Sequence, residues 1–197
     1  MSLLPIVRMG DPVLRRQADT LPPERLSEPE TQRFLDDMIE TMRDADGVGL
    51  AAPQVGEAVQ LFVYESVPEN EEGDGGDAAD DGGRDGSIPL RVVVNPMIEP
   101  EPGELVYDWE GCLSIPDLRG LVPRHPAVRV RGLDRHGAPL DYVARGFEAR
   151  IVQHEFDHLN GVLFLDRMRD LKSLSFYDEW EEHLRGAADD LRALRPE

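Results

Sequence analysis

Apolar side chains recur at helical spacing early in the chain, and this pattern predicts one amphipathic helix. The recurring positions are Phe34, Leu35, Met38, Ile39 and Met42. A repeat of three and four residues places them on one face, so we expect a helix that ends near Ala45 and packs by that face. Ser27, followed three residues later by Glu30, has the form of a capping box and predicts that this helix begins there.

A second helical pattern lies near residues 147–159 and is apolar on two sides. Steps of about 100° per residue place one group of side chains in a narrow arc, namely Phe147, Ile151, His154 and His158. The opposite side carries Ala149, Val152, Phe156 and Leu159. A helix that is apolar on both sides is buried, and Gly161 is suited to end it. We therefore expect a central helix that brings two histidines into the interior.

Strand patterns fill most of the space between these helices. Runs rich in β-branched and aromatic residues cover residues 60–65, 90–95 and 104–109. Residues 127–133 and 139–144 alternate around the turn Asp134-Arg135-His136-Gly137, which indicates a hairpin with one wet face. A last group of apolar residues predicts a terminal helix docked on one side: Leu171, Leu174, Phe176, Trp180 and Leu184. The expected fold is α+β, with antiparallel β-sheets packed around the central helix and a helix at each end.

Length and hydropathy limit the organisation of the chain. Its 197 residues suffice for one well-packed domain, so we expect residues 1–197 to form a single catalytic unit. No apolar run approaches the ~20 residues that a membrane span needs. Pro5 and Arg8 interrupt the short apolar start, which argues against a signal peptide. A cytoplasmic protein without membrane contact is expected.

The charge is strongly negative, at −19. A basic face is typical of nucleic-acid-binding proteins, so direct binding to nucleic acid is not expected. Part of the charge is local, because residues 69–87 hold eight acids, one arginine and six glycines, the composition of a disordered acidic loop. Lys172 is the single lysine. Adaptation to high salt and codon bias both explain that composition, and the sequence does not separate them.

The segment Gln153-His154-Glu155-Phe156-Asp157-His158 carries the first chemical signal. Histidines four residues apart share one helix face, and His-Glu-x-x-His is the pattern of metal hydrolases, in which two imidazoles hold a divalent ion and the carboxylate moves protons. The alternative is a chance match within an ordinary helix. Burial argues against chance, because unpartnered histidines and a glutamate are costly in an apolar helix.

Cys112 is the natural third ligand of such a site. A lone cysteine excludes an internal disulfide, although it could also be a buried small hydrophobe. A catalytic divalent ion keeps three protein ligands and an open position for water, and a thiolate with two imidazoles is an accepted set. These ligand types alone favour zinc.

Two further segments complete a family pattern. Gly47-x-Gly49-x-Ala51-Ala52-x-Gln54 and Glu110-Gly111-Cys112-Leu113-Ser114 precede the histidine segment. In this order and at these separations, the three motifs resemble those of bacterial peptide deformylases. The resemblance extends from about Leu4 to Arg167.

This resemblance implies a reaction and its participants. The metal ligands would be Cys112, His154 and His158. Glu155 would shuttle protons, and Gln54 through its side-chain amide and Leu113 through its backbone N–H would stabilise an oxyanion. The implied hydrolase removes the N-formyl group from the initiator methionine of nascent peptides and releases formate, a step of N-terminal methionine processing in protein biosynthesis. The implied cofactor is one Fe²⁺ ion, for which Zn²⁺, Ni²⁺ or Co²⁺ can substitute in purified protein.

The substrate would be held by side chains beside the metal. Phe147 and Ile151 share the arc of His154 and form an apolar slot for methionine, to which the resemblance adds Val48. Gly49 and Gly111 would leave their backbones free to pair with the substrate as an added strand. In relatives the C-terminal helix contacts the ribosome, which implies a transient contact here.

Two other functions share part of this pattern. A zincin-type peptidase also uses His-Glu-x-x-His but takes its third ligand from further along the chain, where His183 is the only later histidine. A structural metal site is closed by four ligands, whereas this sequence offers three.

Overall fold

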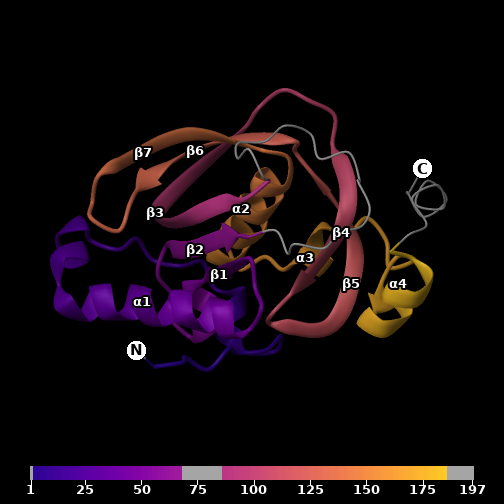
Figure 1. Ribbon diagram of the computed structural model, residues 1–197, viewed down its shortest axis with the longest axis horizontal. Coiled ribbons are helices and arrows are strands. Elements are labelled where there is room, and N and C mark those ends of the chain that lie inside the picture. Colours follow the sequence, from indigo (N-terminus) through magenta and orange to yellow (C-terminus); the bar gives the residue numbers. More distant parts are fainter. Residues whose placement is uncertain (1, 68–85, 186–197) are drawn as a thin grey trace.

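Two antiparallel sheets, with one helix between them, organise the protein (Figure 1). The computed structural model describes residues 2–67 and 86–185. The five-stranded sheet has the order β1 (Gly49–Ala51), β2 (Leu61–Ser66), β3 (Ile88–Pro100), β6 (Ala127–Leu133) and β7 (Pro139–Arg145). The three-stranded sheet has the order β4 (Val106–Cys112), β5 (Ile115–Arg124) and β8 (Ser175–Phe176). The expected α+β fold is confirmed.

Four α-helices accompany the sheets in the described residues. They are α1 (Pro29–Asp44), α2 (Gly146–Leu159), α3 (Phe164–Arg167) and α4 (Tyr177–His183). Short 3-10 turns occupy Pro12–Arg15, Pro23–Ser27 and Ala52–Val55. None of the helices in the described part of the chain combines the length and the apolar character that crossing a bilayer requires.

Alternation along β2 explains why the five-stranded sheet is covered on both faces. Phe62 and Tyr64 join the apolar cluster that packs against α2, whereas Leu61 and Val63 join the cluster that packs against α1. Successive side chains of a strand point to opposite faces, so this run of apolar residues serves two cores. One face of the sheet therefore packs against α2, the helix that carries the two histidines.

Helix α1 confirms the predicted periodicity but not the predicted start. Leu35, Met38 and Met42 are fully buried, as expected for the apolar face. The capping box was wrong: the helix begins at Pro29 with Glu28 as its N-cap, and the Ser27 hydroxyl donates to the Glu24 carbonyl instead. Proline favours the first helical position because its missing N–H needs no partner there.

The helix that carries the histidines has the predicted limits. It ends with Asn160 as the C-cap, and Gly161 follows with a φ of +70°. A glycine adopts this left-handed conformation without the strain that a Cβ would cause.

The β4–β5 hairpin contains the strand that the sequence pattern missed. Pro116, Gly120 and Pro123 interrupt the apolar alternation of β5. The strand nevertheless pairs with β4 from Val106↔Arg124 to Cys112↔Ile115. Cys112 consequently stands at the very end of β4, beside the tight turn to β5.

The C-terminal helix is shorter than its apolar pattern suggested. Helix α4 contains Trp180, but Phe176 belongs to β8 and is 66% exposed, and Leu171 lies outside any helix. The predicted acidic loop at 69–87 lies outside the described residues apart from Gly86 and Ser87.

Candidate metal centre and active site

Helix α2 and strand β4 bring three potential metal ligands together. The ligand atoms of Cys112, His154 and His158 all lie within 4.8 Å of one another, and Cys112 Sγ is 3.3 Å from His158 Nε2. All three residues come from rigid elements that the hairpin and the five-stranded sheet hold in place. A buried thiol and two imidazoles match the donor set of catalytic Zn²⁺ and Fe²⁺ sites, so the residues fit a divalent ion.

Glu110 orients His154. Its Oε2 lies 2.9 Å from His154 Nδ1. With Nδ1–H donating to this carboxylate, the lone pair of Nε2 is left for an ion. Burial raises the pKa of a carboxyl, but the hydrogen bonds from Arg124 and His154 outweigh it and hold the pKa of Glu110 well below its usual range. Glu110 is therefore a permanent anion behind the histidine.

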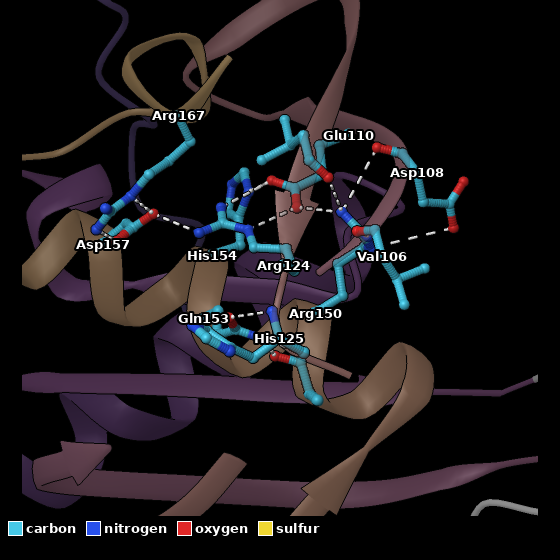
Figure 2. Close-up of polar contacts among 12 residues, drawn as sticks. Val106, Asp108, Glu110, Arg124, His125, Arg150, Gln153, His154, Asp157 and Arg167 are labelled. Atoms are coloured by element: carbon cyan, nitrogen blue, oxygen red, sulfur yellow. Dashed lines mark hydrogen bonds and ion pairs between the residues drawn. The ribbon is translucent and has the colours of Figure 1, made fainter. Parts of the chain in front are cut away.

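A buried network of ion pairs holds Glu110 itself (Figure 2). Arg124 donates to both oxygens of Glu110 at 2.8 and 2.9 Å, and Arg150 Nη1 donates to Oε1 at 2.8 Å. Arg124 also reaches Asp157 at 2.6 Å, and Arg167 forms a two-pronged pair with the same Asp157. The network joins β4, β5, α2 and the end of α3. Sequence reasoning assigned no role to these residues, although Glu110 and Asp157 stand inside the motif segments.

Glu155 is buried one residue after the first histidine. Its side chain packs against the backbone of Gly49, where a Cβ would overlap the carboxylate and lie 2.8 Å from Cδ. Its Oε2 has no hydrogen-bond partner among the described residues. Burial raises the pKa of this carboxyl to about 7. A carboxyl poised near neutral pH can both accept and return a proton.

Gln54 presents its amide nitrogen toward the thiol. Its Oε1 accepts a hydrogen bond from the Ala51 N–H at 2.8 Å, which fixes which end of the amide faces the site. Its Nε2 then lies 3.6 Å from Cys112 Sγ and 3.4 Å from Ser114 Oγ. The glycine-rich segment and the cysteine segment therefore meet in space, because β1, the 3-10 turn after it and β4 lie together here.

A cavity of about 460 Å³ opens onto these groups. Ten of the predicted site residues line it: Val48, Gly49, Gln54, Gly111, Cys112, Leu113, Phe147, Ile151, His154 and Glu155. His158 lies behind them and is 1% exposed. Val48 and Phe147 are 40% and 52% exposed, whereas Ile151 is 3% exposed, so the apolar lining runs from an open rim to a closed floor.

Neither competing arrangement is present in the described residues. His183, the later histidine, lies on α4, where its Nε2 is 3.5 Å from Glu179. The cluster of potential ligands that includes Cys112 has three members within the described ranges, fewer than the four that close a structural site.

Comparisons with known proteins agree with this geometry. A family model described as Polypeptide deformylase matches residues 3–174. Peptide deformylase 1 of Nitrosomonas europaea is 40% identical over 176 residues, which cover 88% of this chain and 92% of the relative. Peptide deformylase 2 of Bordetella bronchiseptica is 45% identical over 171 residues, with 87% and 90% covered.

Solved structures give the same result. The Met-Ala-Ser-bound class I type b peptide deformylase of Acinetobacter baumannii has a TM-score of 0.74 at 36% identity, and the match covers 85% of this chain and 100% of that one. The actinonin complex of a peptide deformylase from Synechococcus elongatus has a TM-score of 0.69 at 40% identity, covering 85% and 79%.

Proposed function

The chain belongs to the polypeptide deformylase family and removes the N-formyl group from nascent polypeptides, and we propose that Glu155, Gln54 and Leu113 carry out this hydrolysis. One observation supports the proposal above all. Glu155 and Gln54 both line the cavity onto which Cys112 and His154 open, so the reacting groups share one enclosed space.

The metal site would be filled by Fe²⁺ in the cell. Cys112, His154 and His158 would hold the ion, which as a Lewis acid makes water easier to deprotonate and polarises a carbonyl group. Zinc binds most such sites more tightly than ferrous iron, so Zn²⁺, Ni²⁺ or Co²⁺ can replace iron during purification. Metal analysis of protein purified without oxygen tests this. Zinc as the dominant ion under those conditions would contradict the choice of iron.

Glu155 would move the protons. Its carboxylate accepts a proton from the attacking water, and hydroxide adds to the formyl carbon. Glu155 then returns this proton to the departing amine, which leaves formate and a free N-terminus. Such general acid–base catalysis typically contributes about 10²- to 10⁴-fold in rate.

Gln54 and Leu113 would stabilise the formyl oxygen as it gains negative charge. The Gln54 amide is already oriented by Ala51, so its Nε2 can donate without rearrangement. The Leu113 backbone N–H is the second donor, from the tight turn after β4. Loss of one such donor typically costs about 3 kcal/mol of barrier. Replacing Gln54 with Ala should therefore lower kcat roughly 100-fold at unchanged metal content.

Val48, Phe147 and Ile151 would form the slot for the methionine side chain. Gly49 and Gly111 would offer backbone groups to the peptide on its two sides, as in strand addition. A relative solved with Met-Ala-Ser bound supports a peptide of this kind in the cavity.

An assay with matched peptides tests the proposed function. Formyl-Met-Ala-Ser should release formate, and unformylated Met-Ala-Ser should not be cut at any bond. A peptidase would give the reverse, and new amine from the unformylated peptide alone would falsify the deformylase assignment.

Replacing Glu155 with Ala should keep the metal and remove most of the activity. If the Glu155→Ala variant lost its metal and its fold, but the fraction that refolded still turned over substrate, the role given to Glu155 would be contradicted.

We further propose one catalytic unit that works in the cytoplasm. A single domain predicts one cooperative unfolding transition, and two separated transitions would contradict it. A cysteine ligand must stay reduced, which suits the cytoplasm, and cell fractionation tests the location.

Contact with the ribosome would be transient. Helix α4 presents Asp178, Glu179, Glu181 and Glu182. Ribosomal RNA repels such a surface. Co-sedimentation that persists at high salt would contradict a transient contact.

A further inference from the structure

Residues 2–9 form an irregular N-terminal arm that runs beneath α1 toward the turn between β4 and β5 (Figure 1). None of these residues lines the active-site cavity. The arm is tied to α1 where the Leu4 N–H donates to Thr41 Oγ1 at 2.9 Å. Terminal segments are poorly ordered unless such bonds hold them. The partners of the arm therefore indicate what it supports.

Two backbone N–H groups of the arm reach two segments of the active site. The Val7 N–H donates to the Gln54 carbonyl at 2.9 Å, and the Met9 N–H donates to the Ser114 carbonyl at 2.8 Å. Gln54 carries the side-chain amide proposed to stabilise the oxyanion. Ser114 directly follows Leu113, whose backbone N–H is the second proposed donor. Donors two residues apart in the arm thus hold the segments that carry both oxyanion donors.

These two segments belong to different sheets. Gln54 lies in the 3-10 turn after β1 of the five-stranded sheet, whereas Leu113 lies between β4 and β5 of the three-stranded sheet. Their direct side-chain contacts are long, with Gln54 Nε2 3.4 Å from Ser114 Oγ and 3.6 Å from Cys112 Sγ. The backbone bonds from the arm have the usual N–H···O length. The arm therefore links the two segments through shorter hydrogen bonds than their direct contacts.

Side chains of the arm and of the turn after it pack on the same segments. Ile6 packs against the apolar cluster that Leu113 also contacts. Val7 packs against the cluster that contains Cys112. Leu14, in the 3-10 turn that follows the arm, is fully buried in that second cluster. Backbone bonds and apolar packing consequently fix the arm on both sides of the cysteine segment.

The spacing of oxyanion donors matters because each donor must lie about 2.7–3.1 Å from the place where the charge develops. A displacement of about 1 Å can cost roughly 100-fold in rate. We propose that Val7 and Met9 are positioning residues, whose backbone N–H groups fix the Gln54 and Leu113 donors relative to each other. This inference rests on the roles proposed above for Gln54 and Leu113, and it gives the N-terminal arm a part in the reaction.

Proline substitution removes one N–H of the arm and keeps the preceding residue extended. In the full-length, metal-loaded enzyme, replacing Val7 with Pro should lower kcat for formyl-Met-Ala-Ser about tenfold and leave KM within about twofold. KM should hold because the arm does not line the cavity. Metal content should equal that of the wild type. Met9→Pro should act in the same direction.

Arg8→Pro is the matched control, since it places the same ring between the two donors. Arg8 is exposed, and its N–H donates no hydrogen bond within the part of the chain that the structure describes. Its kcat should stay within about twofold of the wild type. A loss as large as that of Val7→Pro would show that the missing hydrogen bond is not the cause, and the inference would be wrong.

A double variant separates positioning from a general structural effect. Because Val7 acts through Gln54, the kcat of V7P/Q54A should be no lower than that of Q54A alone. Met9 acts on the other segment, so M9P should still lower the kcat of Q54A. A purely structural loss would add fully in both combinations.

Distinct results overturn distinct claims. If the wild type releases no formate from formyl-Met-Ala-Ser, the proposed function fails, whatever the arm does. If the wild type is active but V7P keeps its kcat, changes only KM, or adds fully to Q54A, the inference about the arm fails.

If Val7→Pro does not fold, Ile6→Ala and Ile6→Val decide. Shortening Ile6 to Ala loosens the arm at the cluster that Leu113 contacts, so kcat should fall at unchanged KM. Ile6→Val, which removes a single methyl group, should keep most of the kcat. An Ile6→Ala variant with the kcat of the wild type, or with a loss only in KM, would overturn the inference.

Discussion

The absence of a side chain at position 49 determines where the Glu155 carboxyl group can lie. Gly49 is the first residue of β1, and the Glu155 carboxylate occupies the space that a Cβ would fill. The glycine is not required by its backbone conformation, since its φ is not in the left-handed region. It is required because a buried carboxyl packs directly against its backbone.

Replacing Gly49 with Ala should therefore impair catalysis more than folding. The added methyl would push Glu155 away from the ligands, and we expect kcat to fall at least about 100-fold, the lower range of general acid–base contributions. Metal content by elemental analysis should stay at that of the wild type. Gly103→Ala is the control, because its Cβ would meet only the Pro126 ring at 3.0 Å, outside the cavity. Equal activity of the two variants would contradict the packing argument.

At the level of single residues, the sequence predicted the ligands but not what supports them. Cys112, His154 and His158 could be found because thiol and imidazole groups are rare in this chain and their motif spacing is specific. Glu110 was part of a motif, yet its partners Arg124 and Arg150 lie elsewhere in the chain. Arginines are abundant in this sequence, so nothing in the pattern marks these two as buried.

At the scale of elements, buried ion pairs connect β4, β5 and α2 where apolar packing does not. Arg124 is 4% exposed and bridges Glu110 of β4 to Asp157 of α2. Each charge in this network is compensated by the next, and removal of one member leaves the others buried without a partner.

Replacing Arg124 with Met should accordingly destabilise the metal-loaded protein by about 3–5 kcal/mol. Urea denaturation measures the change in the free energy of unfolding. Arg129→Met is the matched control, since Arg129 pairs with Asp141 on the surface, where the two side chains are 41% and 48% exposed. Exposed pairs contribute little to stability, because solvent screens them. A loss for Arg124→Met no greater than for Arg129→Met would show that the buried network adds nothing.

A tyrosine pair between β2 and β7 should make stability sensitive to alkali. The hydroxyls of Tyr64 and Tyr142 are 2.6 Å apart, and Tyr64 also donates to Glu148 at 2.9 Å. Burial raises the pKa of Tyr142 to about 12 and that of Tyr64 further. An unfolded tyrosine has a pKa of about 10. The folded state thus holds these protons more tightly, so the stabilisation is complete below about pH 10 and is lost as pH rises toward 12 and beyond.

Replacing Tyr142 with Phe should make the free energy of unfolding less sensitive to rising pH in this range. The free energy of unfolding of wild type and variant, measured by urea denaturation at several values between about pH 9 and 12, should fall more steeply for the wild type. Parallel curves would mean that the pair does not hold its protons in the folded state.

The first and last residues of helices and strands were harder to predict than their presence. The period-2 and helical patterns found α1, α2, β2, β6 and β7 because apolar faces must be buried whatever their partners are. Strand β5 was missed because two prolines and a glycine break its alternation, and pairing with β4 overrides that local signal. The Ser27 signal failed because Pro29 fixes the start of α1 more strongly than a serine side chain does.

Across the whole molecule, excess negative charge opposes compaction. The formal charge of −19 is far from neutral, and like charges on a folded surface repel one another. Salt shortens the reach of this repulsion, with a Debye length of about 10 Å at 0.1 M and about 3 Å at 1 M.

Stability should therefore increase with ionic strength. Raising NaCl from about 0.02 to 0.5 M should increase Tm by several degrees, since about 1 kcal/mol corresponds to roughly 2–4 °C in a chain of this size. Choline chloride at the same ionic strength should give a similar shift, because screening does not depend on the cation. A Tm that falls or stays constant with both salts would mean that attractive surface pairs outweigh the net repulsion.

An ion held jointly by β4 and α2 would also lengthen the lifetime of the protein in a cell. Cys112 and His158 are separated by 46 positions, so coordination closes a long loop in a chain whose lone thiol cannot form an internal bridge. Ions that bind only the native form stabilise it by mass action. A cell short of the divalent ion that fills this site would consequently lose enzyme through proteolysis of the loosened chain as well as through empty sites, and its capacity to mature new proteins would track its metal supply.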